Sequence, residues 1–156
     1  MARDIQTEIK QRKPFNCREE ELFLNILRSS DLLQRRIGEV LKASELSSTQ
    51  YNVLRILRGA GSEGLACGEI SNRMVTRDPD ITRLLDRLEK RGLVARSREK
   101  EDRRVVTARI AQAGLDLLKK LDEPVVQMHR AQLGHLEAQQ QETLIRLLEI
   151  AREKVP

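Results

Sequence analysis

The arginines of residues 76–110 have the clearest capacity for chemistry in this chain, because they fall on two adjacent predicted elements. Apolar residues three and four apart, at Ile81, Leu84, Leu85 and Leu88, predict an amphipathic helix that continues to Arg91 and stops at Gly92. The opposite side of this helix is predicted to carry Pro79, Arg83, Asp86 and Lys90, flanked by Thr82 and Arg87. Guanidinium groups on such a face can pair with phosphates or with the edges of bases.

A strand–turn–strand unit is predicted to follow this helix. Residues 94–98 and 105–110 have strand composition, and the second stretch alternates apolar and polar side chains. The charged segment between them, which includes Asp102, Arg103 and Arg104, predicts a solvated tip. Arginines at the tip of a protruding hairpin can reach a narrow minor groove, and Asp102 can hold a neighbouring arginine by a carboxylate–guanidinium pair. For the hairpin alone, a charged turn without a binding role is the alternative.

The helix and the hairpin together favour double-stranded DNA as the partner. A recognition helix enters the major groove with its N-terminal residues at the base edges. Pro79, Thr82 and Arg83 are therefore the candidates for reading bases, with Arg77 near a phosphate and Arg87 at the flank. Arg83 can pair with a guanine, and Thr82 can contact a thymine methyl group. An ordinary solvated helix face is the alternative, but a basic helix beside a basic hairpin favours DNA.

Shorter helices are predicted to position this unit. Ser47 and Gln50 have the spacing of a capping box, which predicts the start of a helix at that point. A short helix is expected near residues 67–74. For the helix that carries the arginines, Asp78 is the expected N-cap and Pro79 the expected first turn.

Long helices are predicted on both sides of the unit. Residues 18–41 have an apolar stripe wider than one contact face needs, so this helix is expected to pack against two partners at once. A second long helix is predicted from Gln112, with Pro124 as a kink or local break, and a last helix at 139–154. Homodimerisation about a twofold axis is the simplest way to bury the apolar faces of these helices.

Four parts are therefore expected along the chain. Residues 1–16 are a polar arm, expected to be ordered only by a partner, and 17–45 form a first helix that serves both dimerisation and the core. A winged helix-turn-helix occupies 46–111, and the long C-terminal helices at 112–156 serve dimerisation. The expected fold class is mainly α with a small β-hairpin wing: a winged helix-turn-helix with N- and C-terminal dimerisation helices.

Composition agrees with this interpretation and argues against other classes. The 156 residues carry a net charge of +5 and a pI near 9.6, which suits a nucleic-acid partner. The longest apolar stretches are too short to span a membrane, so a cytoplasmic protein is expected. Two cysteines and two histidines, scattered along the chain, predict no metal site and no cofactor. Without a glycine-rich phosphate loop or a nucleophile–His–carboxylate set, an enzyme is not expected.

The segment 78–110 and the stretch before it resemble a known family. The sequence reads DPDITRLLDRLEKRGLVARSREKEDRRVVTARI, with ITRLLDRLEKRGLV as the recognition helix, DRR at 102–104 as the wing, and LSSTQYNVLRIL upstream at 46–57. These motifs resemble the MarR (multiple antibiotic resistance regulator) family of bacterial transcription factors. The resemblance implies a homodimer on a pseudo-palindromic operator, with Arg103 in a minor groove and Asp102 bracing the wing. Ala66 stands where the family usually has a Thr or Ser cap, and Ile110-Ala111 where it has Leu-Thr.

The resemblance also implies a signal that controls DNA binding. Family members commonly respond to small aromatic acids or other amphipathic molecules, and others sense oxidants through cysteine. Tyr51 is the candidate effector contact, although a plain core role is favoured, and Cys17 at a helix start is the candidate redox residue, although an unreactive thiol is favoured. The expected function is a sequence-specific DNA-binding transcriptional regulator, a ligand-responsive repressor. The alternatives are a cysteine-based oxidant sensor on the same scaffold and a winged-helix protein-interaction module without DNA binding.

Overall fold

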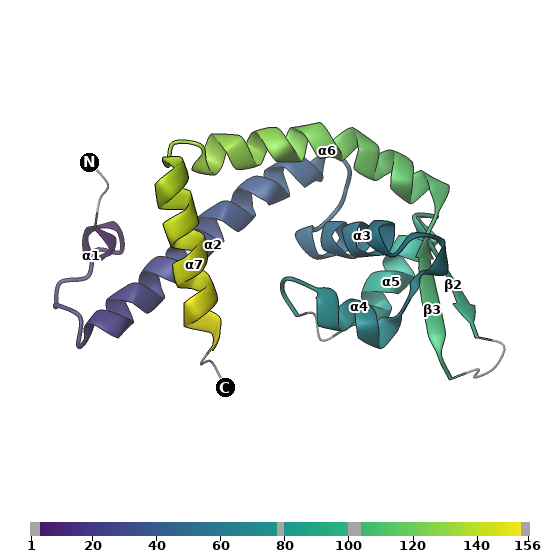
Figure 1. The fold of residues 1–156 in the computed structure, drawn as a ribbon, viewed down its shortest axis with the longest axis horizontal. Helices are drawn as coiled ribbons and strands as arrows, with labels where there is room; N and C mark the ends of the chain where they lie inside the picture. The colour runs from purple at the N-terminus through teal and green to yellow at the C-terminus, as the bar shows by residue number, and fades with distance from the viewer. Residues whose placement is uncertain (1–3, 78–79, 100–103, 154–156) are drawn as a thin grey trace.

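The computed structural model describes residues 4–77, 80–99 and 104–153, which form helices and one small sheet (Figure 1). The helices are α1 (Ile5–Glu8), α2 (Arg18–Lys42), α3 (Ser48–Ala60), α4 (Cys67–Arg73), α5 (Ile81–Lys90), α6 (Gln112–Leu133) and α7 (Ala138–Glu153), with a short 3-10 turn η1 (Gly61–Glu63). The strands are β1 (Leu65–Ala66), β2 (Val94–Arg98) and β3 (Val106–Ile110). The mainly helical fold with a winged helix-turn-helix, expected from the sequence, is confirmed.

Figure 1 shows two parts of the molecule. The lobe consists of α3, α4, α5 and the three strands, and the hairpin of β2 and β3 projects from one of its ends. The arm consists of α1, α2, α6 and α7; α2 and α6 pack against each other above the lobe, and α7 crosses α2 far from the hairpin. Helix α1 lies at the far end of the arm, so α1 and the hairpin are at opposite ends of the molecule.

The core lies inside the lobe and under its junction with the arm. Its fully buried large side chains come from five helices and are Leu41, Val53, Leu54, Leu57, Ile70, Leu85, Leu88 and Leu118. Leu41 and Leu118 belong to the arm helices α2 and α6, so the arm covers the lobe at this point. The leucines predicted to form the inner face of the α5 helix are all buried.

Local signals fix the ends of the lobe helices. At the start of α3, the Gln50 N–H donates to the Ser47 hydroxyl at 3.1 Å and the Ser47 N–H donates to the Gln50 side chain at 3.0 Å. This is the predicted capping box. At the end of α5, Gly92 has φ +68° and its N–H donates to the Glu89 carbonyl, while the Leu93 N–H donates to that of Leu88. This paired closure is the usual reason for a glycine at a helix end.

The predicted start of α5 is wrong by two residues. The helix begins at Ile81, and its N-cap is Asp80, whose carboxylate accepts the Arg83 N–H at 3.1 Å. Asp78 was expected to be this cap because it precedes a proline suited to a first turn. Asp78 and Pro79 themselves lie outside the described residues. A carboxylate three residues before the bonded N–H is the geometry that a cap needs, and Asp80 provides it.

The sheet has three antiparallel strands rather than the two of a simple hairpin. Its order is β1-β3-β2. The sequence did not predict β1, whose Leu65 lies opposite Ala108 of β3. The turn that brings β1 to β3 depends on Gly64, which has φ +70°. A Cβ at this glycine would lie 2.4 Å from the Ala108 carbonyl oxygen, so the two backbones approach too closely for any side chain.

The N-terminal segment and helix α6 differ from their predictions. Residues 1–16 were expected to be ordered only by a partner, but α1 folds against α2 with Ile5 buried and Glu8 3.4 Å from Arg28. The second difference is at Pro124, where a break was an expected possibility. Instead α6 continues through Pro124 as one helix. No helix in the described residues is both long and apolar enough to cross a membrane.

Candidate nucleic-acid interface

The outer face of α5 presents polar side chains to solvent, as its periodicity predicted. Thr82, Arg83 and Arg87 are all exposed. The Arg83 side chain is 78% exposed, and its Nε lies 3.2 Å from a carboxylate oxygen of Asp80. One carboxylate thus caps the helix and pairs with the first arginine of the face. This pairing holds the guanidinium near the helix N-terminus, where base-reading side chains lie in recognition helices.

The segment leading into α5 is anchored to the lobe by a residue that the sequence did not single out. The Val75 N–H donates to the Asn52 side chain of α3 at 2.9 Å. Beyond this anchor, the Val75 side chain is 90% exposed and Arg77 is exposed as well. Arg77, the predicted phosphate contact, therefore lies two residues after a backbone N–H that is held by a hydrogen bond. Pro79, the other candidate in this segment, lies outside the described residues.

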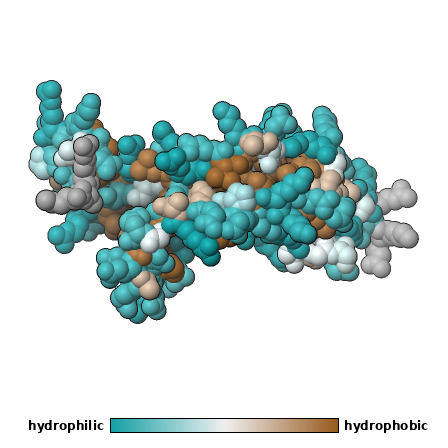
Figure 2. All heavy atoms as spheres, turned by 90° about the horizontal axis from the view of Figure 1, so that it is seen from above, coloured by the Kyte–Doolittle hydropathy of each residue, from teal (hydrophilic) through white to brown (hydrophobic). Residues whose placement is uncertain are grey.

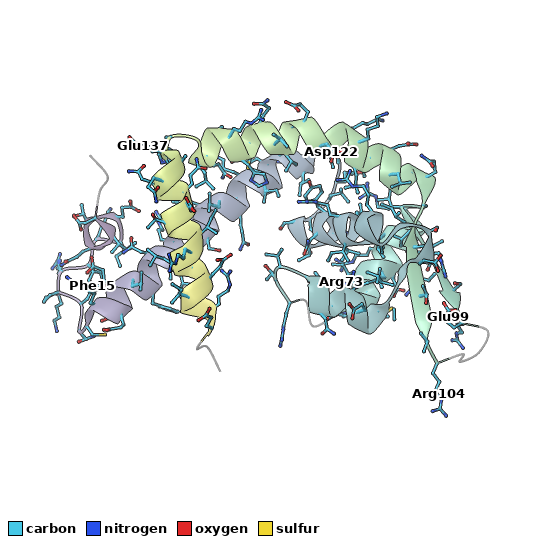
Figure 3. The ribbon with its side chains drawn as sticks, viewed as in Figure 1. Phe15, Arg73, Glu99, Arg104, Asp122 and Glu137 are labelled. Atoms are coloured by element: carbon cyan, nitrogen blue, oxygen red, sulfur yellow. The ribbon has the colours of Figure 1, made fainter. Side chains whose placement is uncertain are left out.

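The hairpin carries a second arginine surface at the end of the lobe. Figure 3 shows Arg104 at the outer end of β3, pointing away from the body of the protein. Its side chain is exposed. Asp102 and Arg103, predicted as the wing brace and the minor-groove contact, lie outside the described residues. Arg98, at the outer end of β2, is also exposed.

An arginine missed by the sequence reasoning joins these two surfaces. Arg96 of β2 donates to the Glu89 carboxylate from Nε at 3.1 Å and from Nη2 at 2.7 Å, and Nη2 also pairs with Asp86. Asp86 was predicted to lie on the outer polar face of the helix. It is half-buried and turned toward the sheet instead. Hydrogen bonds from Arg96 hold the pKa of Glu89 below its ordinary value, and Glu89 in turn raises the pKa of Arg96.

Two arginines attach the lobe to the arm. Arg58 of α3 donates from one nitrogen to both carboxylate oxygens of Asp122 on α6, at 3.0 and 2.9 Å. Arg91, just after α5, donates to the carbonyl oxygens of Ser44 at 2.9 Å and Glu45 at 2.8 Å. Both bonds join residues more than forty positions apart, which periodicity and capping patterns do not reveal. Arg58 ties α3 to the middle of α6, and Arg91 ties the end of α5 to the residues that follow α2.

The candidate signal residues lie apart from the arginine surfaces. Tyr51 is 5% exposed in the core, with the Arg55 guanidinium 5.9 Å from its ring centre, so the structure places it in the favoured core role. Its role in effector binding stays a prediction. Cys17 is the exposed N-cap of α2, and Cys67 is half-buried with its thiol donating to the Val106 carbonyl at 3.6 Å. Among the described residues, no cluster of His, Cys, Asp and Glu could hold a metal ion.

Comparison with known proteins agrees with this geometry. A model of the MarR family matches residues 46–106, which include α3 to α5 and β2. The HTH-type transcriptional regulator PrsX of Escherichia coli is 32% identical over 113 residues, which cover 72% of this chain and 68% of PrsX. A crystal structure of a MarR transcription factor from Planctomyces limnophilus is 47% identical, covers 88% of this chain and 99% of that chain, and has a TM-score of 0.69.

The fold is also that of a protein solved with DNA. The crystal structure of a cysteine-to-serine mutant of MarR from Escherichia coli, in complex with operator DNA, covers 96% of this chain and 99% of that chain. Its TM-score is 0.77 at 24% identity, so this likeness concerns the fold alone. Proteins of this family regulate transcription and are not enzymes. Helix, hairpin and sequence together therefore assign this chain to the MarR family of DNA-binding transcriptional regulators.

Proposed function

We propose that this chain is a ligand-responsive repressor that binds a pseudo-palindromic operator as a homodimer. The observation that carries the proposal is the presence of two exposed arginine surfaces on one lobe, on α5 and on the hairpin. A helix of this kind fits the major groove, and a basic hairpin fits the adjacent minor groove. The operator complex of the MarR fold supports the same use of this lobe.

Within one lobe, the proposed contacts differ in what they recognise. Thr82 and Arg83 lie in the first turn of α5 and read base edges in the major groove, together with Pro79. Arg77 and Arg87 lie before and beside them and contact phosphates, which adds affinity without selectivity. At the hairpin, Arg103 and Arg104 enter the minor groove and Asp102 braces the tip. These roles follow from position on the elements and from the chemistry of the side chains.

The arm supplies the proposed dimer surface. Many large apolar side chains on its helices are at least 38% exposed in the single chain, and those on α2 and α7 include Leu22, Phe23, Ile26, Leu27, Leu144, Ile145, Leu147 and Ile150. Figure 2, which views the protein from above, shows apolar side chains open on the surface between hydrophilic ones. Helix α7 contains no buried residue at all within this chain. A second copy packed against α2 and α7 would cover these side chains and place two lobes side by side.

The dimer explains the form of the operator and the proposed sign of regulation. Two lobes related by a twofold axis read two half-sites of opposite direction, about one helical turn apart. A protein bound across both half-sites covers DNA that polymerase needs when the operator overlaps a promoter. Repression by occlusion requires no contact beyond the proposed DNA interface and the proposed dimer surface.

A small molecule is proposed to control the spacing of the two lobes. BpsR of Bordetella bronchiseptica has the same fold, with a TM-score of 0.79 at 20% identity, and its DNA binding is regulated by 6-hydroxynicotinic acid. In this chain the corresponding control point would be the junction of lobe and arm, near Tyr51 and the Arg58–Asp122 pair. A ligand that binds one arrangement of this junction better than another shifts the lobes between them.

The test is a gel shift with the promoter next to the chain's own gene, at two salt concentrations. We expect sequence-selective binding that weakens steeply as salt rises, because phosphate contacts release counterions. A competitor of the same length and base composition, but with a scrambled half-site, is the matched control. Equal binding to both fragments, or no binding at any tested site, would reject the proposal in favour of a winged helix that binds protein.

A further inference from the structure

The recognition helix and the wing are joined at one point by three groups that the proposed DNA contacts do not use. Glu89 and Asp86 lie on the side of α5 that faces the sheet, and Arg96 reaches both from β2. The Arg96 side chain is only 20% exposed. Its backbone N–H also donates to the Glu89 carboxylate, at 3.1 Å. Thus both the main chain and the side chain of one strand residue are bound to the helix.

The position of β2 in the sheet makes this attachment informative. In the order β1-β3-β2, β2 is an edge strand whose inner neighbour is β3. On the outer edge of β2, the N–H of Arg96 has no neighbouring strand to bind within the described part of the chain. The carboxylate of Glu89 on α5 accepts its hydrogen bond instead. The hairpin is therefore held to the rest of the lobe on two sides: through the ladder of β1 and β3, and through the contact with α5.

The planar guanidinium gives the contact a direction as well as a charge. Nε and Nη2 both donate to one carboxylate oxygen of Glu89, while Nη2 is shared with Asp86, three residues earlier on α5. We call this guanidinium, bound to the carboxylates of Glu89 and Asp86, the fork. Because it is held at two points along the helix, it resists rotation of the strand about the helix better than a single point charge. The contact also neutralises two carboxylates of a helix that approaches phosphates.

We propose that Arg96 is a positioning residue that sets the direction of the wing relative to the recognition helix, so that both enter their grooves together. The inference rests on the proposed function, because it assigns Arg96 a role in DNA binding without a DNA contact. When the fork is intact, the hairpin tip is held in register with the minor groove beside the half-site read by α5. When it is lost, α5 still enters the major groove but the wing no longer follows.

Dimethyl sulfate footprinting tests this on one DNA fragment, because it reports guanine N7 in the major groove and adenine N3 in the minor groove. We expect Arg96→Met to keep protection of the guanines within the half-site and to lose protection of the flanking adenines. Its affinity should fall about tenfold, since wing contacts are lost while helix contacts remain. Arg96→Lys, which keeps the charge but not the fork, should show the same loss of adenine protection with a smaller loss of affinity.

A second variant separates direction from charge. Arg96→Met combined with Asp86→Asn and Glu89→Gln removes the arginine together with both carboxylates. We expect to recover only the part of the affinity that the two uncompensated carboxylates cost, and we expect adenine protection to stay lost. If adenine protection returned, Arg96 would act only by neutralising the helix, and the inference would be wrong. It would also be wrong if Arg96→Met gave the footprint of the natural protein.

Two controls keep the result distinct from misfolding and from failure of the proposed function. Arg36→Met breaks another arginine–carboxylate pair, with Glu39 on α2, where both side chains are about two-thirds exposed. It should leave both footprints unchanged. Guanine protection retained in Arg96→Met shows that its lobe is folded. If the natural protein gave no footprint at any site, DNA binding itself would be rejected, whereas an unchanged footprint in Arg96→Met rejects only the positioning role.

Discussion

Helix α5 of the lobe and helix α7 of the arm are both amphipathic, but only α5 buries its apolar face within this chain. In α5 the leucines at positions 84, 85 and 88 are all buried, and the polar side is left for a partner. In α7 none of the residues is buried, although leucines and isoleucines recur along it. The apolar side chains of α5 are thus covered by the same chain, whereas those of α7 have no buried position within it. The difference supports the proposed dimer, in which a second copy would cover α7 while the lobe is stabilised within its own chain.

The largest expected effect comes from substitutions that disrupt the proposed dimer surface of the arm and leave the lobe intact. Leu144→Glu with Leu147→Glu places two charges on one side of α7, at side chains that are 43% and 58% exposed. We expect the dimer dissociation constant to rise about a thousandfold, or about 4 kcal/mol, because two buried apolar contacts are lost and two charges desolvated. Analytical ultracentrifugation measures this directly.

The control places two glutamates at polar positions of that helix, as Gln139→Glu with Arg146→Glu. This variant should remain a dimer. If the leucine variant also remained a dimer at micromolar concentration, α7 would not be the surface that a second copy covers.

The next effect breaks the lobe and spares the arm. Leu85→Ala removes a fully buried side chain of α5, and we expect the free energy of unfolding to fall by about 3 kcal/mol. Ile145→Ala is made in the monomeric Leu144→Glu, Leu147→Glu variant, where no second copy covers α7. There it should change the free energy of unfolding by less than about 0.5 kcal/mol, since that side chain is 58% exposed. Urea unfolding followed by circular dichroism compares the two. Equal losses would contradict the division into a self-covered lobe and an uncovered arm.

A smaller effect concerns recognition and leaves both cores intact. Arg83→Ala should weaken binding to the correct half-site by about 1–2 kcal/mol and hardly alter binding to a mismatched one, because a base contact is lost. Fluorescence anisotropy with a matched and a mismatched duplex gives the ratio. A uniform loss on both duplexes would show that Arg83 contacts phosphate instead. Dimer formation is the internal control and should be unchanged.

The smallest effect is a dependence of lobe stability on pH. Hydrogen bonds from Arg96 lower the pKa of Glu89 in the folded protein, so the stabilisation exists above the ordinary glutamate pKa of 4.5 and is lost as pH falls through the lowered value. Glu89→Gln should therefore be less stable than the natural protein at pH 7, with the difference shrinking below pH 4.5. Urea titrations at several pH values test this. A difference that stays constant with pH would assign the loss to packing.

Features set by neighbours in the chain were predictable from sequence. The Ser47–Gln50 capping box and the Gly92 helix end each depend on residues within a few positions of each other. The inner leucines of α5 follow from helical spacing alone. For the same reason, the exposed Thr82, Arg83 and Arg87 could be named as candidates from the sequence.

Features that depend on distant partners were not predictable in this way. Strand β1 has two residues and exists because β3, forty positions later, pairs with it. Asp86 was assigned to the outer face because helical angle places it there, yet Arg96 draws its carboxylate toward the sheet. The cap of α5 shows a different limit, since Asp78 and Asp80 both fit a cap by residue type and only the start of the helix distinguishes them.

The close approach of backbones at Gly64 has a consequence for inheritance. A Cβ at this position would lie 2.4 Å from the Ala108 carbonyl oxygen, so Gly64→Ala damages the sheet of the lobe while leaving every residue of the arm in place. Chains with this substitution would still pair with normal chains. In the proposed dimer, with both versions made in equal amounts, random pairing would leave only about a quarter of the dimers with two working lobes. A single methyl group would thus produce a dominant-negative allele rather than a recessive one.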